Sequence, residues 1–142
     1  MEKIGYLIKK DYQGVINKIE NQISEWERNN LKVKKYYINF QNSDSRFRKV
    51  KLFFQLENGY NQQLLKLKKD NISLIYTRYD LFIPSFYKII KTYPTIMEIN
   101  SDDLAELKQK SLTTYLYNKT FRNKILQKVK GFVTVTNELK RK

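Results

Sequence analysis

The chain of 142 residues contains neither cysteine nor histidine. Without cysteine there are no disulfide bonds and no thiolate metal sites. Without histidine the usual metal ligand is missing, and so is the side chain that most often acts as a general base near neutral pH. Histidine-based catalytic triads are therefore excluded, and we expect neither a metal ion nor a cofactor.

Glycine and long apolar segments are also scarce. The chain has four glycines, and Gln13-Gly14 is too poor in glycine for a Walker loop or a G-x-G-x-x-G phosphate cradle. The opening MEKIGYLIKK is not apolar enough for a signal peptide, and no segment approaches the roughly 20 apolar residues of a membrane span. These features predict a cytoplasmic location.

Acidic residues are half as numerous as basic ones, 14 against 28, which gives a net charge of +14. Such an excess favours polyanionic partners, namely nucleic acid, an anionic membrane surface or phosphorylated substrates. The lysines are scattered more than clustered, however, so a generally lysine-rich surface explains them equally well. Eleven tyrosines would suit a nucleic-acid surface. Because no RNP-like, KH-like or helix-turn-helix pattern accompanies them, we do not expect nucleic acid as the partner.

The segment 71–103 has the pattern of a β-α-β unit. Ile72–Tyr76 is a short run rich in strand formers, and Thr95–Ile99 is a second one. Between them, Pro84 suits the first turn of a helix and Pro94 ends it. The two strands are therefore expected to be parallel.

The first 38 residues repeat this pattern. Ile4–Ile8 predicts a strand, Val15–Asn29 an amphipathic helix that ends at asparagine, and Leu31–Ile38 a second strand. The length allows one domain, residues 1–142. We predict an α/β, Rossmann-like three-layer domain with a mainly parallel sheet of five or six strands. The first strand should be central, because the strand order reverses beside it in doubly wound sheets.

Two regions have weaker patterns. In residues 41–69, Val50, Leu52, Phe54 and Leu56 alternate as in a strand, but Phe47, Val50 and Phe54 also suit a helix. We favour helix there, with a break at Asn58-Gly59 followed by a short second helix. Leu104–Val129 is predicted to be mostly helical, and Phe132–Val135 to be a strand. Thr136 or Asn137 then suits the N-cap of a further helix.

Polar residues follow the strands of the 71–103 unit. Arg78 and Tyr79 follow the first strand, and Asn100 follows the second. Ligands bind at this edge in open α/β sheets. Arg78 can bind a phosphate or carboxylate in bidentate fashion, or it can form a structural ion pair with Asp80 or Asp102.

Glu98, Asp102 and Asp103 form an acidic cluster at the end of the second strand. The two neighbouring aspartates can serve as a general base or bind a divalent cation. Alternatively, Ser101, Asp102 and Asp103 cap the next helix and interact with its positive end.

Four segments in order resemble one family: GVINKIENQISEWERNNLKV, SLIYTRY, PTIMEINSDDL and GFVTVTNEL. The chain resembles the N-terminal, Rossmann-like domain of GT-B glycosyltransferases, which include many bacterial enzymes of cell-surface polysaccharide assembly. In such enzymes two Rossmann-like domains face each other across a cleft. The N-terminal domain mainly holds the acceptor, and the C-terminal domain binds the nucleotide-sugar donor.

The resemblance implies the acceptor-binding half of a hexosyl-type transferase, acting on a saccharide or lipid-linked acceptor. The donor-binding domain is absent from these residues, so we expect no transfer by this chain alone. Many relatives have a histidine where this chain has Asn100, so any base would be a carboxylate, Asp102 by preference. The residues implied in acceptor binding are Gln13, Gly14, Arg78, Tyr79, Asn100, Ser101, Asp103, Thr136, Asn137 and Glu138.

Because acceptors of this family are often lipid-linked, the resemblance also suggests contact with the inner face of the membrane. Lys108–Lys142 contains ten basic residues and one acid, Glu138, which would attract it to anionic lipid. The alternative function is a non-enzymatic basic α/β module that binds nucleic acid or an anionic surface.

Overall fold

The computed structural model describes residues 3–10, 13–40, 47–79, 81–99, 105, 108–109 and 111–134. Within these residues, five strands form one sheet in which all neighbouring strands are parallel. The strands are β1 (Lys3–Lys9), β2 (Lys32–Ile38), β3 (Leu74–Arg78), β4 (Thr95–Ile99) and β5 (Gly131–Thr134). The predicted parallel sheet is therefore confirmed.

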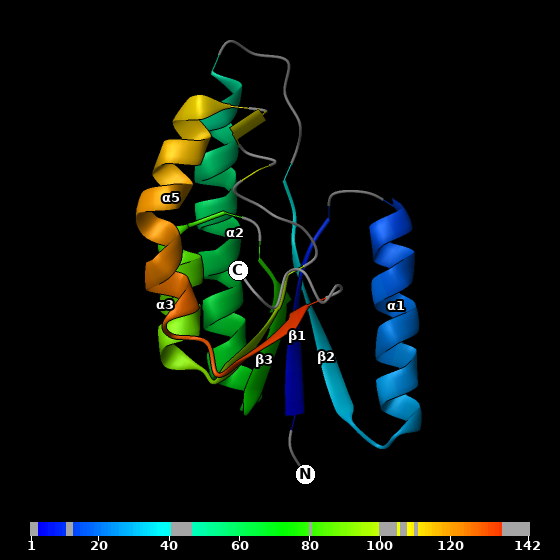
Figure 1. Cartoon of the computed structure of the whole chain (residues 1–142). Helices are drawn as coiled ribbons and strands as arrows, with labels where there is room; N and C mark the ends of the chain where they lie inside the picture. Colours follow the sequence, from blue (N-terminus) through cyan, green and yellow to red (C-terminus); the bar gives the residue numbers. More distant parts are fainter. Residues whose placement is uncertain are drawn as a thin grey trace.

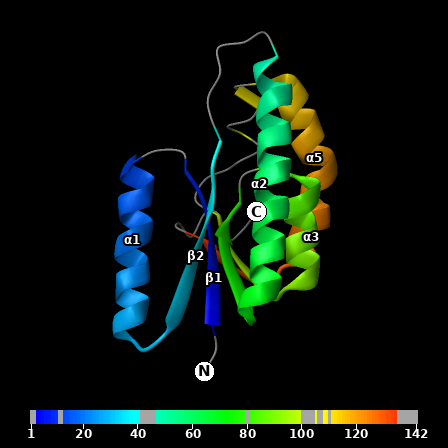
Figure 2. The ribbon, with the colours of Figure 1, turned by 180° about the vertical axis from the view of Figure 1, so that it is seen from behind.

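Helices cover both faces of this sheet (Figures 1 and 2). Four described helices do so: α1 (Gln13–Arg28) on one face, and α2 (Arg48–Asp70), α3 (Pro84–Thr92) and α5 (Leu112–Leu126) on the other. Each face has its own apolar core, with Ile19 and Ile23 of α1 buried on the first. Leu67, Phe86 and Ile125 are buried on the second. The structure confirms the predicted Rossmann-like three-layer fold.

The strand order β2-β1-β3-β4-β5 reverses beside the first strand, as predicted. From β1 the chain crosses to β2 on one side, and it later returns to β3 on the other. β1 therefore has a neighbouring strand on each side, as a central strand would, but the middle strand of the five is β3. The carboxyl ends of β1 and β3 flank the point of reversal, where ligands bind in doubly wound sheets.

Two predicted helices begin and end close to the expected residues. The helix predicted from Val15 starts at Gln13, and Asn30 follows its end with φ 63°. This left-handed conformation is one that asparagine tolerates. α3 begins at Pro84, whose missing N–H costs nothing in a first turn, and the chain leaves the helix before Pro94.

The predicted break at Asn58-Gly59 is wrong. α2 runs without interruption through both residues for 23 residues. Gly59 is needed for close packing rather than for a turn, because a Cβ added there would lie 2.9 Å from Cγ2 of Ile38. The glycine lets the helix approach the edge strand β2.

The C-terminal third is described in part. α5 covers Leu112–Leu126, and its N-cap Ser111 accepts a hydrogen bond from the Thr114 N–H at 3.4 Å. β5 covers Gly131–Thr134, and the predicted continuation to Val135 and the following cap lie outside the described residues. No helix in the described part of the chain is long and apolar enough to cross a membrane.

Candidate functional site

The carboxyl edge of β3 and β4 holds an ion pair between neighbouring strands. Arg78 is the last residue of β3 and lies beside Glu98 in the parallel register. An Nη2–H of Arg78 donates to Oε1 of Glu98 at 2.9 Å. The Glu98 side chain is only 5% exposed and that of Arg78 is 20% exposed. The pair is therefore largely removed from solvent.

Glu98 was not among the partners proposed for Arg78 from the sequence. Arg78 does form a structural ion pair, with Glu98, a residue noted only as part of an acidic cluster. Asp80 and Asp102 themselves lie outside the described residues. Sequence spacing could not reveal this pairing, because it depends on the register between β3 and β4.

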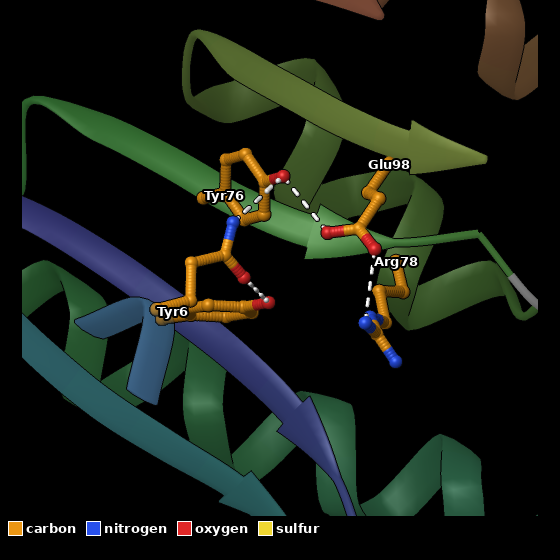
Figure 3. Close-up of polar contacts among 5 residues, drawn as sticks. Tyr6, Tyr76, Arg78 and Glu98 are labelled. Carbon is orange, nitrogen blue, oxygen red and sulfur yellow. Dashed lines mark hydrogen bonds and ion pairs between the residues drawn. The ribbon is translucent and has the colours of Figure 1, made fainter. Parts of the chain in front are cut away.

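A chain of hydrogen bonds extends from this ion pair to α1 (Figure 3). The hydroxyl of Tyr76 donates to Oε2 of Glu98 at 2.9 Å. Nε2 of Gln22 donates to the Tyr76 hydroxyl at 3.3 Å, and the Tyr6 hydroxyl donates to Oε1 of Gln22 at 3.1 Å. We call Tyr6, Gln22, Tyr76, Arg78 and Glu98 the buried network. It joins β1, α1, β3 and β4.

Trp26 of α1 packs against both tyrosines of the buried network. Its ring centroid lies 5.8 Å from that of Tyr6 in a stacked arrangement. It lies 4.8 Å from that of Tyr76, edge to face. Both geometries are favourable for aromatic pairs. The aromatic side chains therefore pack together on the α1 side of the buried network.

Burial controls the ionisation of these tyrosines. Desolvation, with added repulsion from the Glu98 carboxylate, raises the pKa of Tyr76 to about 12. The pKa of Tyr6 is raised further, again mainly by burial and then by Glu98. Both phenols therefore keep their protons near neutral pH. They act as fixed hydrogen-bond donors and not as bases.

Arg78 retains unused hydrogen-bonding capacity. Its Nε is buried and has no hydrogen-bond partner among the described residues. In Figure 3 its second terminal nitrogen points away from Glu98. A guanidinium held in this way can bind a carboxylate or phosphate at the sheet edge.

The other predicted site residues are placed as follows. Gln13 and Gly14 begin α1, just after β1. The Tyr79 hydroxyl donates to Oδ1 of Asn118, and the Tyr79 ring lies 5.7 Å from the Arg122 guanidinium. Tyr79 is thus held against α5. The remaining ones lie outside the described residues: Asn100, Ser101, Asp102, Asp103, Thr136, Asn137 and Glu138.

No sequence pattern identified Tyr6 and Gln22 as part of this site. Tyr6 lies inside a predicted strand and Gln22 inside a predicted helix, where each looks like an ordinary structural residue. Only the packing of α1 over β1 and β3 brings them together. The described residues contain no group of three or more acidic side chains arranged to hold a metal ion.

Comparison of the chain with protein-family models, with curated proteins and with solved structures found no match.

Proposed function

We propose that this chain is the acceptor-binding half of a glycosyltransferase whose nucleotide-sugar donor is bound by a separate domain. The observation that supports this most is the position of Arg78. It lies at the carboxyl edge of a parallel sheet, beside the reversal of strand order, and Glu98 fixes its direction. This is the edge at which ligands bind in open α/β folds.

The proposed acceptor is a saccharide or a lipid-linked saccharide. A lipid-linked acceptor carries phosphates, and a planar guanidinium matches phosphate oxygens with two parallel N–H bonds. Because Glu98 already holds Arg78 in place, little side-chain entropy is lost when the acceptor binds. The buried network supports the binding residue and is not itself a reacting group.

The catalytic role of Asp102 stays a prediction. In the proposed reaction the acceptor hydroxyl loses a proton to a carboxylate within about 2.6–3.2 Å or through one water. Asp102→Asn keeps the size of the side chain and much of its capping ability. In a transferase that includes the donor domain, we expect it to abolish transfer with little change in melting temperature. Loss of stability with normal activity per folded molecule would mean that Asp102 only caps a helix.

Binding measurements test the proposed function. Calorimetric titration of the full chain with a polyprenyl-diphosphate-linked sugar in detergent micelles should show saturable binding. Arg78→Gln should weaken it about tenfold or more, the loss expected for a charge-assisted hydrogen bond. Arg78→Lys, which keeps the charge beside Glu98, separates lost binding from lost folding. Arg28→Gln, which alters an exposed ion pair on α1, serves as the control.

Unchanged binding in folded Arg78→Gln would rule out the proposed site. Binding of single-stranded nucleic acid that weakens steeply with salt, with no saccharide binding, would instead support the non-enzymatic basic module.

A further inference from the structure

An open groove of about 800 Å³ lies between the edge strand β2 and helix α2. Among the described residues, five lysines line it: Lys10, Lys34, Lys35, Lys66 and Lys69. Asp70 is the single acid among these described lining residues. We call this the β2–α2 groove. It is separate from the buried network, none of whose residues line it.

Part of the positive charge in the groove is compensated. Nζ of Lys34 lies 2.7 Å from Oδ1 of Asp70, and the Tyr36 hydroxyl donates to Oδ2 of the same carboxylate at 2.7 Å. These two hydrogen bonds hold the pKa of Asp70 below its ordinary range. Lys35 forms an ion pair with Glu20 of α1. Asp70 and Glu20 therefore compensate the charges of Lys34 and Lys35, respectively.

Three lysines supply the net positive charge. Within the described residues, no carboxylate forms an ion pair with Lys10, Lys66 or Lys69. Lys66 and Lys69 are exposed residues of α2, and Nζ of Lys10 lies 4.6 Å from the ring centroid of Tyr37. Lys66 and Lys69 lie on the α2 wall, and Lys10 lies toward the other end of the groove. Ammonium groups that line a groove raise the local concentration of anions. The ligand of this groove should therefore be negatively charged.

The groove is long. Its α2 wall extends from Gln55 to Asp70, which at 1.5 Å per residue is roughly 22 Å. One end includes Lys10 and Asn39, which follow the carboxyl ends of β1 and β2, and the other reaches the C-terminal end of α2. This shape suits an extended chain better than a compact ligand. The first end opens at the same sheet edge as Arg78.

The polar lining favours a hydroxyl-rich ligand over nucleic acid. Asn39, Asn58 and Gln62 are exposed in the groove, and an amide both donates and accepts hydrogen bonds, as paired hydroxyls require. The described residues of this lining offer no open stacking platform for bases. Lysines lie over the rings of Tyr37 and Phe40, whereas nucleic-acid grooves present open aromatic faces.

The outer edge of β2 is also poorly suited to a peptide that would add as a strand. Nε2 of Gln63 donates to the backbone carbonyl of Tyr37 at 2.9 Å, so this acceptor on the edge is already used. Lysines that flank an edge strand are a common means of preventing such pairing.

We propose that the β2–α2 groove binds an extended acidic saccharide. The groove lysines contact the carboxylates or phosphates of the chain, and the amides contact its hydroxyls. This inference rests on the proposed function and defines its acceptor more closely. The end of the saccharide that receives the new sugar lies at the carboxyl edge, and the rest of the acceptor follows the groove.

The test uses the full chain and three probes of similar length. These are an oligogalacturonate of about ten units, a neutral malto-oligosaccharide and a single-stranded oligothymidylate. We expect the oligogalacturonate to bind most tightly of the three, and we expect its affinity to fall as the salt concentration rises. Lys66→Gln/Lys69→Gln should weaken it roughly threefold to tenfold, as expected for two lost exposed ion pairs.

The control is Lys18→Gln/Lys68→Gln, which removes the same charge from exposed residues of α1 and α2 that do not line the groove. It should change affinity less than twofold. Equal losses in both double variants would show attraction by net charge alone and overturn the proposal. Tighter binding of the oligothymidylate, or equal binding of the neutral saccharide, would also overturn it.

The outcome of this test can be distinguished from the outcome of the Arg78 binding test of the proposed function. If substitution of the groove lysines weakens oligogalacturonate binding while Arg78→Gln leaves the polyprenyl-linked sugar bound, the saccharide site in the groove is supported and the acceptor site at Arg78 is ruled out. If Arg78 matters and the groove lysines do not, the proposed function stands and the acidic-saccharide groove is wrong.

Discussion

Glu98 binds two partners in the buried network, and each depends on its negative charge. One carboxylate oxygen accepts from Arg78 and the other from Tyr76. A buried carboxylate is costly unless its oxygens are hydrogen-bonded and its charge is paired. The two bonds meet both conditions, and the bond from Arg78 fixes the position of its guanidinium.

Glu98→Gln should destabilise the fold by about 2–3 kcal/mol. It removes the charge of a hydrogen-bonded pair and leaves the Arg78 guanidinium partly buried without a counter-ion. Chemical denaturation provides the measurement. Glu25→Gln, which alters the exposed pair with Arg28, should change stability by no more than about 0.5 kcal/mol. Equal effects of both variants would contradict the assigned role of the buried pair.

The raised pKa of Tyr76 predicts that the folded protein loses stability at alkaline pH. Its folded-state pKa of about 12 lies above its ordinary value of 10.0. Its contribution is therefore complete below pH 10, and it is lost as pH rises toward 12, because the unfolded state releases the phenolic proton first. Melting temperatures followed over this range should fall less steeply in Tyr76→Phe. An identical decline in the variant would contradict this assignment.

At the scale of elements, α2 organises one face of the sheet through contacts that its own sequence does not reveal. Gly59 allows it to approach Ile38 of β2. Its Glu57 accepts from the backbone N–H of Ser85 at 2.9 Å, in the first turn of α3. The residue before that helix, Ile83, supplies no side-chain cap. A carboxylate from α2 thus takes the place of a local N-cap for α3.

Gly59→Ala measures how close this helix–strand contact is. In an open position alanine would stabilise a helix by about 1 kcal/mol relative to glycine. Here the added methyl collides with fully buried Ile38, so we expect a net loss of about 1–2 kcal/mol. Ile38→Leu, which lacks the Cγ2 methyl, should recover part of that loss in the double variant.

The control for this experiment is Gly131→Ala, since a Cβ there meets nothing within 4 Å. It should leave the free energy of unfolding nearly unchanged. A stabilising Gly59→Ala would mean that α2 shifts easily and that glycine is not needed for packing.

At the scale of the whole molecule, large apolar side chains are exposed near the N-terminal ends of α2 and α5. Phe47 is 73% exposed, Phe54 65% and Leu112 63%. Nζ of Lys49 lies 2.7 Å from Oγ of Ser111, which brings the two helix starts together. Both lie toward the carboxyl edge of the sheet (Figure 1). Apolar and basic side chains in one region suit the surface of an anionic membrane.

We therefore expect the chain to float with vesicles that contain phosphatidylglycerol more than with pure phosphatidylcholine vesicles. Phe54→Ser should reduce binding about threefold to tenfold through lost apolar burial. Leu65→Ser is the matched control, because Leu65 is 63% exposed on the same helix but three turns away. Equal binding to both vesicle types would rule out this membrane contact.

The sequence alone determined the fold class and most element positions. Alternating and helical apolar spacing depends on local periodicity, so the β-α-β units around Pro84 and Val15 could be predicted without any tertiary contact. The position of Arg78 at the end of a strand followed from the same patterns. The predicted helix break at Gly59 was wrong. It was predicted because glycine weakens helices locally, but in the structure the close packing of Gly59 against β2 determines its role, and α2 continues through it.

Only the tertiary structure decided what each site residue contacts. The partner of Arg78 is set by the register of β3 against β4, and Tyr6 and Gln22 join it through the placement of α1 over the sheet. The β2–α2 groove likewise combines lysines that are as many as 59 positions apart, from Lys10 to Lys69. Such contacts between distant parts of the chain leave no local pattern in the sequence, because they arise only when the layers pack.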